Sequence, residues 1–219
     1  MNSPIIQLLV LAGIAVFLIL RLKSVLGTRE GFEKKPEAEP ARSGARQPAF
    51  EVIEGGPDRD IIDHVPEDSP AAKALADMKR IEPDFSVGEF LGGARGAYEM
   101  ILMAFERGAL EDVRVFLADD VYDSFNDVVV QREQQGLTVD AEFIGVRELQ
   151  IIQATFDDST NLAEITVRFV GELTSVVRDS EGQIIEGKPS EIKRQKDVWT
   201  FARTLGTDDP NWQLVATGE

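Results

Sequence analysis

The chain has 219 residues, a formal net charge of -16 and no cysteine, which excludes disulfides, thiol catalysis and cysteine-based zinc sites. The charge is uneven, because residues 1–57 hold 7 Lys and Arg against 6 Asp and Glu, and the rest of the chain therefore carries about −17. Nucleic-acid binding requires a basic surface, so we predict no nucleic-acid partner for this acidic chain.

Residues 1–26 are predicted to form a transmembrane anchor. No side chain from Met1 to Leu20 is charged, and about 20 residues of helix span the roughly 30 Å of bilayer hydrocarbon. A cleaved signal peptide fits less well, because the start has no basic residue and the run ends without small residues. A helix lying on the membrane surface also fits less well, because the run has no polar face. The predicted anchor residues are Ile5, Leu9, Ile14, Phe17, Leu20, Arg21 and Lys23.

Basic residues after the apolar run set its expected orientation. Arg21, Lys23, Arg29, Lys34 and Lys35 all lie on its C-terminal side. Such residues stay on the cytoplasmic side of a membrane. We therefore expect a single-pass protein whose C-terminal domain is cytoplasmic.

Residues 27–69 are predicted to be a disordered linker. Pro and Gly interrupt this segment and charges of both signs alternate, so it cannot bury enough apolar surface to offset the entropy of ordering. Its roughly 43 residues would reach about 35 Å from the anchor. The apolar piece at residues 49–53 is interpreted as a docking motif or as chance apolarity. The acidic stretch at residues 58–68, with the single histidine, His64, is interpreted as solvated spacer.

Helices are predicted next. Pro70 begins one that runs to residue 81, and Ser86 with Glu89 forms a capping box that begins a second. Three glycines inside the second helix, each costing about 1 kcal/mol relative to Ala, have two interpretations. Either another backbone packs closely on them, or they border a groove that admits a lipid tail or an apolar peptide. These glycines are Gly92, Gly93 and Gly96.

A short helix is predicted at residues 110–117, and Asp119 is expected to be the N-cap of another that ends at Gly136. The residues expected to be buried in this last helix are Tyr122, Phe125, Val128 and Val129.

The apolar period then changes from about 3.6 to about 2, which indicates strands. The clearest alternation runs from Ala163 to Thr174, and a turn follows at residues 179–182. Weaker strands are predicted at residues 143–156, 191–205 and 212–216. Helices followed by antiparallel strands with one polar face predict an α+β fold, with helices packed on one side of a curved antiparallel sheet.

Several motifs together resemble a known family. The run Phe-Leu-Gly-Gly-Ala-Arg-Gly-Ala-Tyr-Glu-Met-Ile at residues 90–101 resembles part of the C-terminal domain of the mitochondrial import-motor tether, subunit forty-four of the inner-membrane translocase. Residues 104–108, the spacing from Val121 to Phe125, Arg132 with Glu133, and residues 197–203 and 210–212 extend the resemblance. It covers residues 70–216, so residues 70–219 are interpreted as a domain of this kind.

The resemblance implies a fold and partners. The family fold is a cone of helices and curved sheet similar to nuclear transport factor two. Its members bind membranes, presequence-bearing or unfolded chains, or ribosomes, without catalysis. Their leading amphipathic helix is associated with cardiolipin, and here Lys73, Lys79 and Arg80 would contact the lipid headgroup. The built-in anchor looks like the bacterial relatives, so the bacterial inner membrane is the expected location. The long basic N-terminal half that would engage a chaperone is absent from this sequence.

We therefore predict a non-enzymatic adaptor or scaffold in protein translocation or membrane-protein biogenesis, with membrane lipid and a protein as partners. Paired aspartates fall at predicted caps and turns, and no catalytic, cofactor or metal site is predicted. Two alternatives stay open: a structural subunit of a larger inner-membrane complex, and a small-molecule enzyme or sensor on the same cone. The residues of the predicted apolar pocket are Phe90, Tyr98, Ile101, Phe105, Phe125, Phe143, Phe169, Trp199 and Phe201.

Overall fold

The computed structural model describes residues 56–218. The predicted anchor, residues 1–26, lies outside this range, as do residues 27–55 of the predicted linker and Glu219. Within residues 56–218, no helix is both long enough and apolar enough to cross a bilayer.

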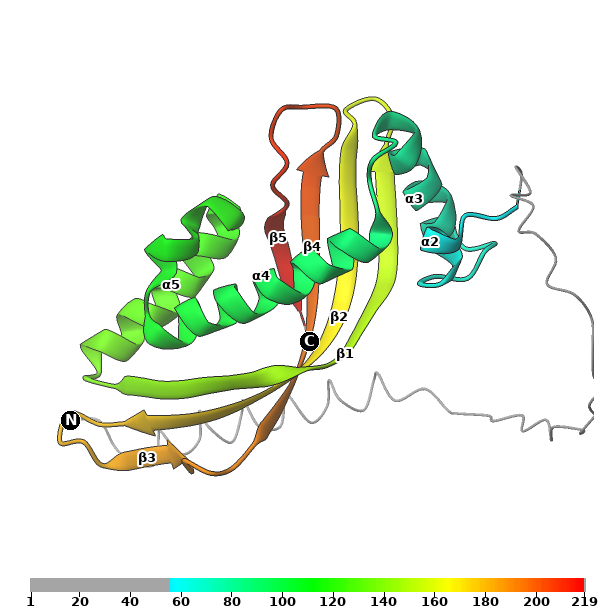
Figure 1. The fold of residues 1–219 in the computed structure, drawn as a ribbon. Helices are drawn as coiled ribbons and strands as arrows, with labels where there is room; N and C mark the ends of the chain where they lie inside the picture. Colours follow the sequence, from blue (N-terminus) through cyan, green and yellow to red (C-terminus); the bar gives the residue numbers. More distant parts are fainter. Residues whose placement is uncertain (1–55, 219) are drawn as a thin grey trace, which may run out of the picture. The chain divides into compact units, whose positions relative to one another are not determined.

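Helices form the first half of this range (Figure 1). The helix predicted at residues 70–81 is confirmed: the Ser69 hydroxyl accepts a hydrogen bond from the Ala72 amide at 3.1 Å, and proline occupies the first turn. Ser86 caps the next helix in the same way through the Glu89 amide. The helices are α2 Arg59–Ile62, α3 Pro70–Ile81, α4 Val87–Arg107, the 3-10 helix η1 Leu110–Phe116 and α5 Asp119–Gln134.

The second half forms one antiparallel sheet in the order β1-β2-β4-β5, and β3 pairs with the end of β2 that extends beyond β4. Figure 1 shows β1 and β2 as a long, bent hairpin. Three register shifts along β1 account for the bend, because bulges kink a strand. The predicted α+β class is confirmed, whereas the cone similar to nuclear transport factor two stays a prediction. The strands are β1 Thr138–Asp157, β2 Leu162–Arg178, β3 Ile184–Gly187, β4 Lys193–Thr204 and β5 Gln213–Gly218.

The core lies between the sheet and the helices that cross it. Alternate residues of β2 are fully buried, as the sequence pattern predicted, and they include Ile165, Val167 and Phe169. From the other side, α4 buries Tyr98 and Ile101 completely. The Tyr98 ring stacks on Phe169, with ring centroids 4.4 Å apart and planes 5° from parallel. This pair joins the middle of α4 to the middle of the sheet.

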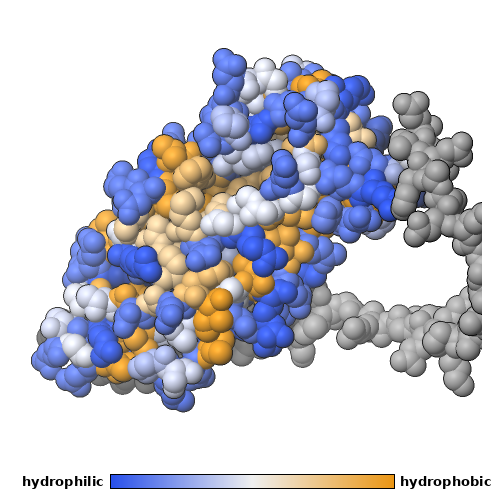
Figure 2. Space-filling model, viewed as in Figure 1, coloured by the Kyte–Doolittle hydropathy of each residue, from blue (hydrophilic) through white to orange (hydrophobic). Residues whose placement is uncertain are grey.

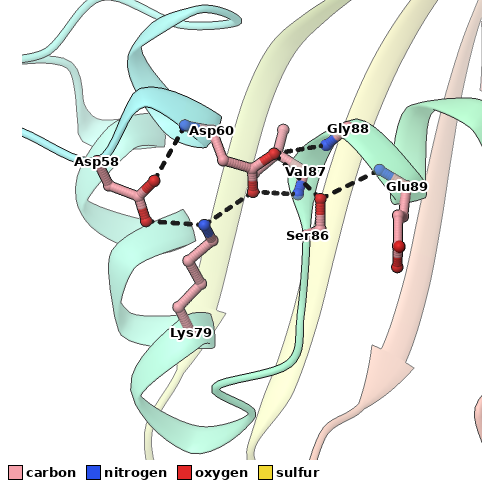
Figure 3. A network of polar contacts seen from close by, with 7 residues as sticks. All are labelled: Asp58, Asp60, Lys79, Ser86, Val87, Gly88 and Glu89. Atoms are coloured by element: carbon pink, nitrogen blue, oxygen red, sulfur yellow. Dashed lines mark hydrogen bonds and ion pairs between the residues drawn. The ribbon is translucent and has the colours of Figure 1, made fainter. Parts of the chain in front are cut away.

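The last part of the predicted linker is ordered, which corrects our expectation for residues 57–69. There the chain forms α2, and Asp60 reaches the start of α4 (Figure 3). The Asp60 carboxylate accepts hydrogen bonds from the Val87 amide at 2.7 Å, the Gly88 amide at 3.0 Å and the Ser86 hydroxyl at 3.1 Å. Lys79 of α3 lies 2.7 Å from this carboxylate. A side-chain anion here satisfies free amide groups at the helix N-terminus and complements the helix dipole.

This network makes the stability of the fold depend on pH. Burial alone would raise the pKa of Asp60, but Lys79 and the donors at the start of α4 lower it overall, well below its ordinary value of 3.8. A carboxyl whose pKa is lower in the folded state contributes its full stabilisation above the unfolded-state pKa. That contribution is lost as the pH falls through the folded-state pKa.

We therefore expect the Asp60→Asn variant to lose stability at neutral pH but progressively less below about pH 4. The measurement is the free energy of urea unfolding of both proteins at several values between pH 7 and pH 3. The difference between them should shrink as the pH falls. A difference that stays constant over this range would contradict the ionic role of Asp60.

Two details of the helices differ from prediction. Asp119 is the first residue of α5 rather than its N-cap, and its carboxylate forms an ion pair with Arg114. Val128 is 40% exposed, because it lies at the edge of the helical stripe that contains Val121 and Val129.

The three glycines of α4 lie on its exposed side. A Cβ atom added at Gly92, Gly93 or Gly96 would meet no atom within 4 Å. Close packing of another backbone on this face, our first interpretation, is therefore wrong for residues 56–218. Gly93 instead borders a groove, which agrees with the second interpretation.

Candidate functional site

The main candidate site is a groove along the N-terminal half of α4. It has a volume of about 460 Å³ and lies between α4, the segment that precedes it and the segment that enters β5. Figure 2 shows apolar residues gathered in the middle of this face of the molecule, with hydrophilic residues around them. The aromatic residues of the groove are Phe85, Phe90, Phe116, Phe201 and Trp212.

Aromatic contacts hold the wall of the groove in place. The ring centroid of Trp212 lies 4.8 Å from that of Phe90 and 6.1 Å from that of Phe85. Phe90 also meets Phe201 of β4 edge to face at 6.1 Å. Phe90 is in the first turn of α4, and Trp212 directly precedes β5, so segments far apart in the sequence build one apolar wall. Gly93, Ala94 and Ala97 leave the helix side of the groove open, because their side chains are small or missing.

The rim of the groove is acidic. Its one basic residue, Arg203, forms an ion pair with Glu82, and its guanidinium also lies 5.6 Å from the centre of the Trp212 ring. Burial would raise the pKa of Glu82, but the Gly206 amide and Arg203 lower it overall. Glu82 and Arg203 offset each other, which leaves the carboxylates of Asp84 and Glu89 to give the rim its negative charge.

The structure separates the predicted pocket residues into three groups. Phe90 and Phe201 line the groove, whereas Phe105, Phe125 and Trp199 line a second cavity of about 240 Å³. The remaining four belong to the core or pack against it: Tyr98, Ile101, Phe143 and Phe169.

Sequence reasoning missed three of the groove aromatics, Phe85, Phe116 and Trp212. Only Trp212 carried a usable signal, because it lies in the Pro-Asn-Trp motif of the family resemblance.

Two of the three predicted lipid-binding cations are held in ion pairs. Lys79 lies 2.7 Å from both Asp58 and Asp60, and its side chain is only 19% exposed. Burial alone would lower the pKa of Lys79, but the two carboxylates raise it overall. Arg80 pairs with Asp77 at 3.1 Å and with Asp158 at 3.0 Å. Lys73 is exposed on the same helix. A lipid headgroup would therefore compete with internal carboxylates for two of these residues.

The family described as "Tim44-like domain" matches residues 71–219, which is most of the chain. This chain belongs to the Tim44-like family. The resemblance found from the sequence motifs is thereby confirmed, and the matched residues begin within α3 and so include the groove. Within residues 56–218, no three His, Asp or Glu side chains gather so that they could hold a metal ion.

Two curated relatives of this Tim44-like chain carry the name "Mitochondrial import inner membrane translocase subunit TIM44". The human protein is 22% identical over 147 residues, which is 66% of this chain and 32% of the relative. The rat protein is 20% identical over the same share of each chain. The chain thus spans about a third of the length of these relatives. A solved structure, the intermembrane space region of the chloroplast protein ARC6, matches with a TM-score of 0.37 and 13% identity. The match covers 66% of this chain and 94% of that one, and the likeness is too slight to support an argument.

Proposed function

We propose that this Tim44-like chain is a membrane-anchored, non-enzymatic adaptor in protein translocation or membrane-protein biogenesis, and that its groove binds an apolar segment of a partner protein. The observation that carries the proposal is the groove itself, whose wall is aromatic and whose rim carries uncompensated acidic charge. The family match and the names of the curated relatives support a role in translocation.

The chemistry of the groove suggests which segments bind. Burying one Leu or Phe side chain in an apolar site contributes roughly 1.5–3 kcal/mol, so one or two apolar anchors would give weak, reversible binding. The carboxylates of Asp84 and Glu89 favour a segment that carries Lys or Arg beside its apolar face, and they disfavour an acidic one. The expected ligand is therefore a basic amphipathic segment.

The membrane anchor at residues 1–26 belongs to the same proposal. It would hold the groove near the cytoplasmic face of a bacterial inner membrane, where emerging or inserting chains pass. We favour a protein segment over a lipid headgroup as the main ligand, because Lys79 and Arg80 are held in ion pairs.

The proposal is tested by filling the groove without damaging the fold. Gly93→Leu places a side chain in the groove, where the position of the new Cβ has no neighbour within 4 Å. Leucine also has a higher helix propensity than glycine. We expect this change to weaken binding of a basic amphipathic peptide by at least roughly tenfold, the scale of one lost apolar anchor. Binding is measured on the full chain in detergent micelles by fluorescence anisotropy of the labelled peptide.

Gly92→Leu is the matched control. Gly92 lies one residue away on α4, is equally free of neighbours and does not line the groove. Peptide affinity should therefore be unchanged in this variant. A peptide in which Glu replaces each Lys and Arg should bind weakly to all three proteins. Equal loss of affinity in both glycine variants, or no loss in Gly93→Leu, would refute binding in the groove.

A further inference from the structure

The second cavity, near the other end of α4, has a chemistry of its own. It has a volume of about 240 Å³ and shares no lining residue with the groove. Phe105 of α4, Phe125 of α5 and Trp199 of β4 bring three aromatic rings to its lining. The ring centroids of Phe105 and Phe125 lie 4.9 Å apart.

The lining of this cavity also includes a half-buried carboxylate, that of Asp197. One of its oxygens accepts a hydrogen bond from the Tyr98 hydroxyl at 2.5 Å, and the other accepts one from the side-chain amide of Gln195 at 3.1 Å. Tyr98 is fully buried, so its hydroxyl is fixed in this position. Burial and the Asp197 charge both raise the pKa of Tyr98. The phenol therefore stays the proton donor and Asp197 the acceptor.

The negative charge of Asp197 is not neutralised within the described range. No ion pair among residues 56–218 includes this carboxylate. The guanidinium of Arg132 packs on the Phe105 ring, 4.3 Å from its centre, and donates a hydrogen bond to the Phe105 carbonyl. Tyr98 and Gln195 satisfy the hydrogen-bonding needs of Asp197, but both are neutral. The carboxylate is therefore free to pair with a bound cation.

We propose that this cavity binds an organic ammonium group, either that of a free alkylammonium ion or that of a lysine side chain. Aromatic faces attract ammonium groups through their quadrupole, and the attraction is strongest where water is excluded. The Asp197 carboxylate supplies the opposite charge, and the small volume limits the ligand to a compact head. The inference does not depend on peptide binding in the groove.

The tryptophans allow a direct test. The chain has two, of which Trp199 lines this cavity and Trp212 lines the groove. The Trp212→Phe variant of the full chain in detergent micelles therefore reports the cavity alone. Choline chloride should give a saturable change in Trp199 fluorescence, and sodium chloride at the same concentration should give none. The control compound is the dimethylbutanol in which a carbon atom replaces the nitrogen of choline, so that it has the same shape but no charge. It should bind at least roughly tenfold more weakly than choline.

Two variants locate the binding site. Asp197→Asn removes the charge but keeps an oxygen that can accept the Tyr98 hydrogen bond, and it should weaken choline binding by roughly tenfold or more. Phe125→Leu removes one aromatic face and leaves Asp197 in place, and it should weaken binding by several-fold, about the value of one cation–π contact. Thermal unfolding checks that each variant is folded. If Asp197→Asn does not fold, the comparison of choline with its uncharged isostere still shows whether the cavity recognises a positive charge.

A last comparison separates the two sources of the ammonium group. Acetyl-lysine methylamide, with a free side-chain amine, is titrated beside choline. Tighter binding of the lysine derivative assigns the cavity to a protein side chain, and tighter binding of choline assigns it to a free ion. The inference is overturned if neither compound changes the fluorescence, if the isostere binds as well as choline, or if folded Asp197→Asn binds choline normally.

Discussion

Replacing Gly171 by alanine should destabilise the folded domain by about 2 kcal/mol, within the range for overpacking a filled core. Gly171 is buried in the middle of β2, and a Cβ atom there would lie 2.7 Å from the Tyr98 hydroxyl oxygen and 2.9 Å from a carbon of its ring. The Tyr98 ring cannot move aside easily, because it stacks on Phe169 and its hydroxyl donates a hydrogen bond to Asp197. The free energy of urea unfolding, compared with the unchanged protein, measures the effect.

Gly92→Ala is the control with the opposite expected sign. Gly92 also lies inside a regular element, but no atom lies within 4 Å of the position of its added Cβ. Alanine should therefore stabilise α4 by up to about 1 kcal/mol through helix propensity alone. If Gly171→Ala were as stable as the unchanged protein, the ring of Tyr98 would be free to shift, and the packing described for the core would be wrong.

Asp60→Ala should cost about 2–4 kcal/mol, because it removes a charged acceptor of three hydrogen bonds and one ion pair. The start of α4 then keeps only the Ser86 cap, and Lys79 keeps only Asp58. Because Asp60 joins the segment before α3 to the start of α4, we also expect residues 57–69 to become accessible to protease first. Urea unfolding and limited proteolysis measure the two effects.

The matched control is Asp158→Ala. Asp158 also pairs with a basic residue of α3, Arg80, at 3.0 Å, but both side chains are mostly exposed. Pairs of this kind contribute about 0–1 kcal/mol, so the variant should unfold almost like the unchanged protein. A loss of stability in Asp158→Ala as large as that in Asp60→Ala would mean that general surface charge, rather than the contact with α4, explains both results.

Both large effects depend on contacts that no local pattern in the sequence records. Residues 58–68 show no apolar periodicity, and their acidic composition is typical of a solvated spacer. Asp60 nevertheless becomes structural, because folding brings it beside an amide 27 positions away. The buried state of Gly171 follows from the alternation along β2, but its intolerance of a side chain depends on a tyrosine of α4 that faces it.

The candidate site, too, could be predicted from the sequence only in part. The sequence identified the apolar aromatics of α4 and the sheet and predicted that they would face each other, which they do. It could not separate those that fill the core, such as Phe169, from those that line a cavity, such as Phe90. That distinction depends on how closely α4 lies to each strand along its length.

The sequence by itself determined the elements whose signals are local: the helix that begins at Pro70, the cap at Ser86, the alternation of β2, and the motifs that indicated the Tim44-like family. Short-range hydrogen bonds and side-chain periodicity are sufficient to specify these features. The tertiary structure alone decided that Asp60 and Lys79 form an ion pair, that the glycine face of α4 is exposed, and that the aromatics are divided between the core, the groove and a separate cavity. These properties depend on distances between residues far apart in the chain, which are fixed only when the core packs.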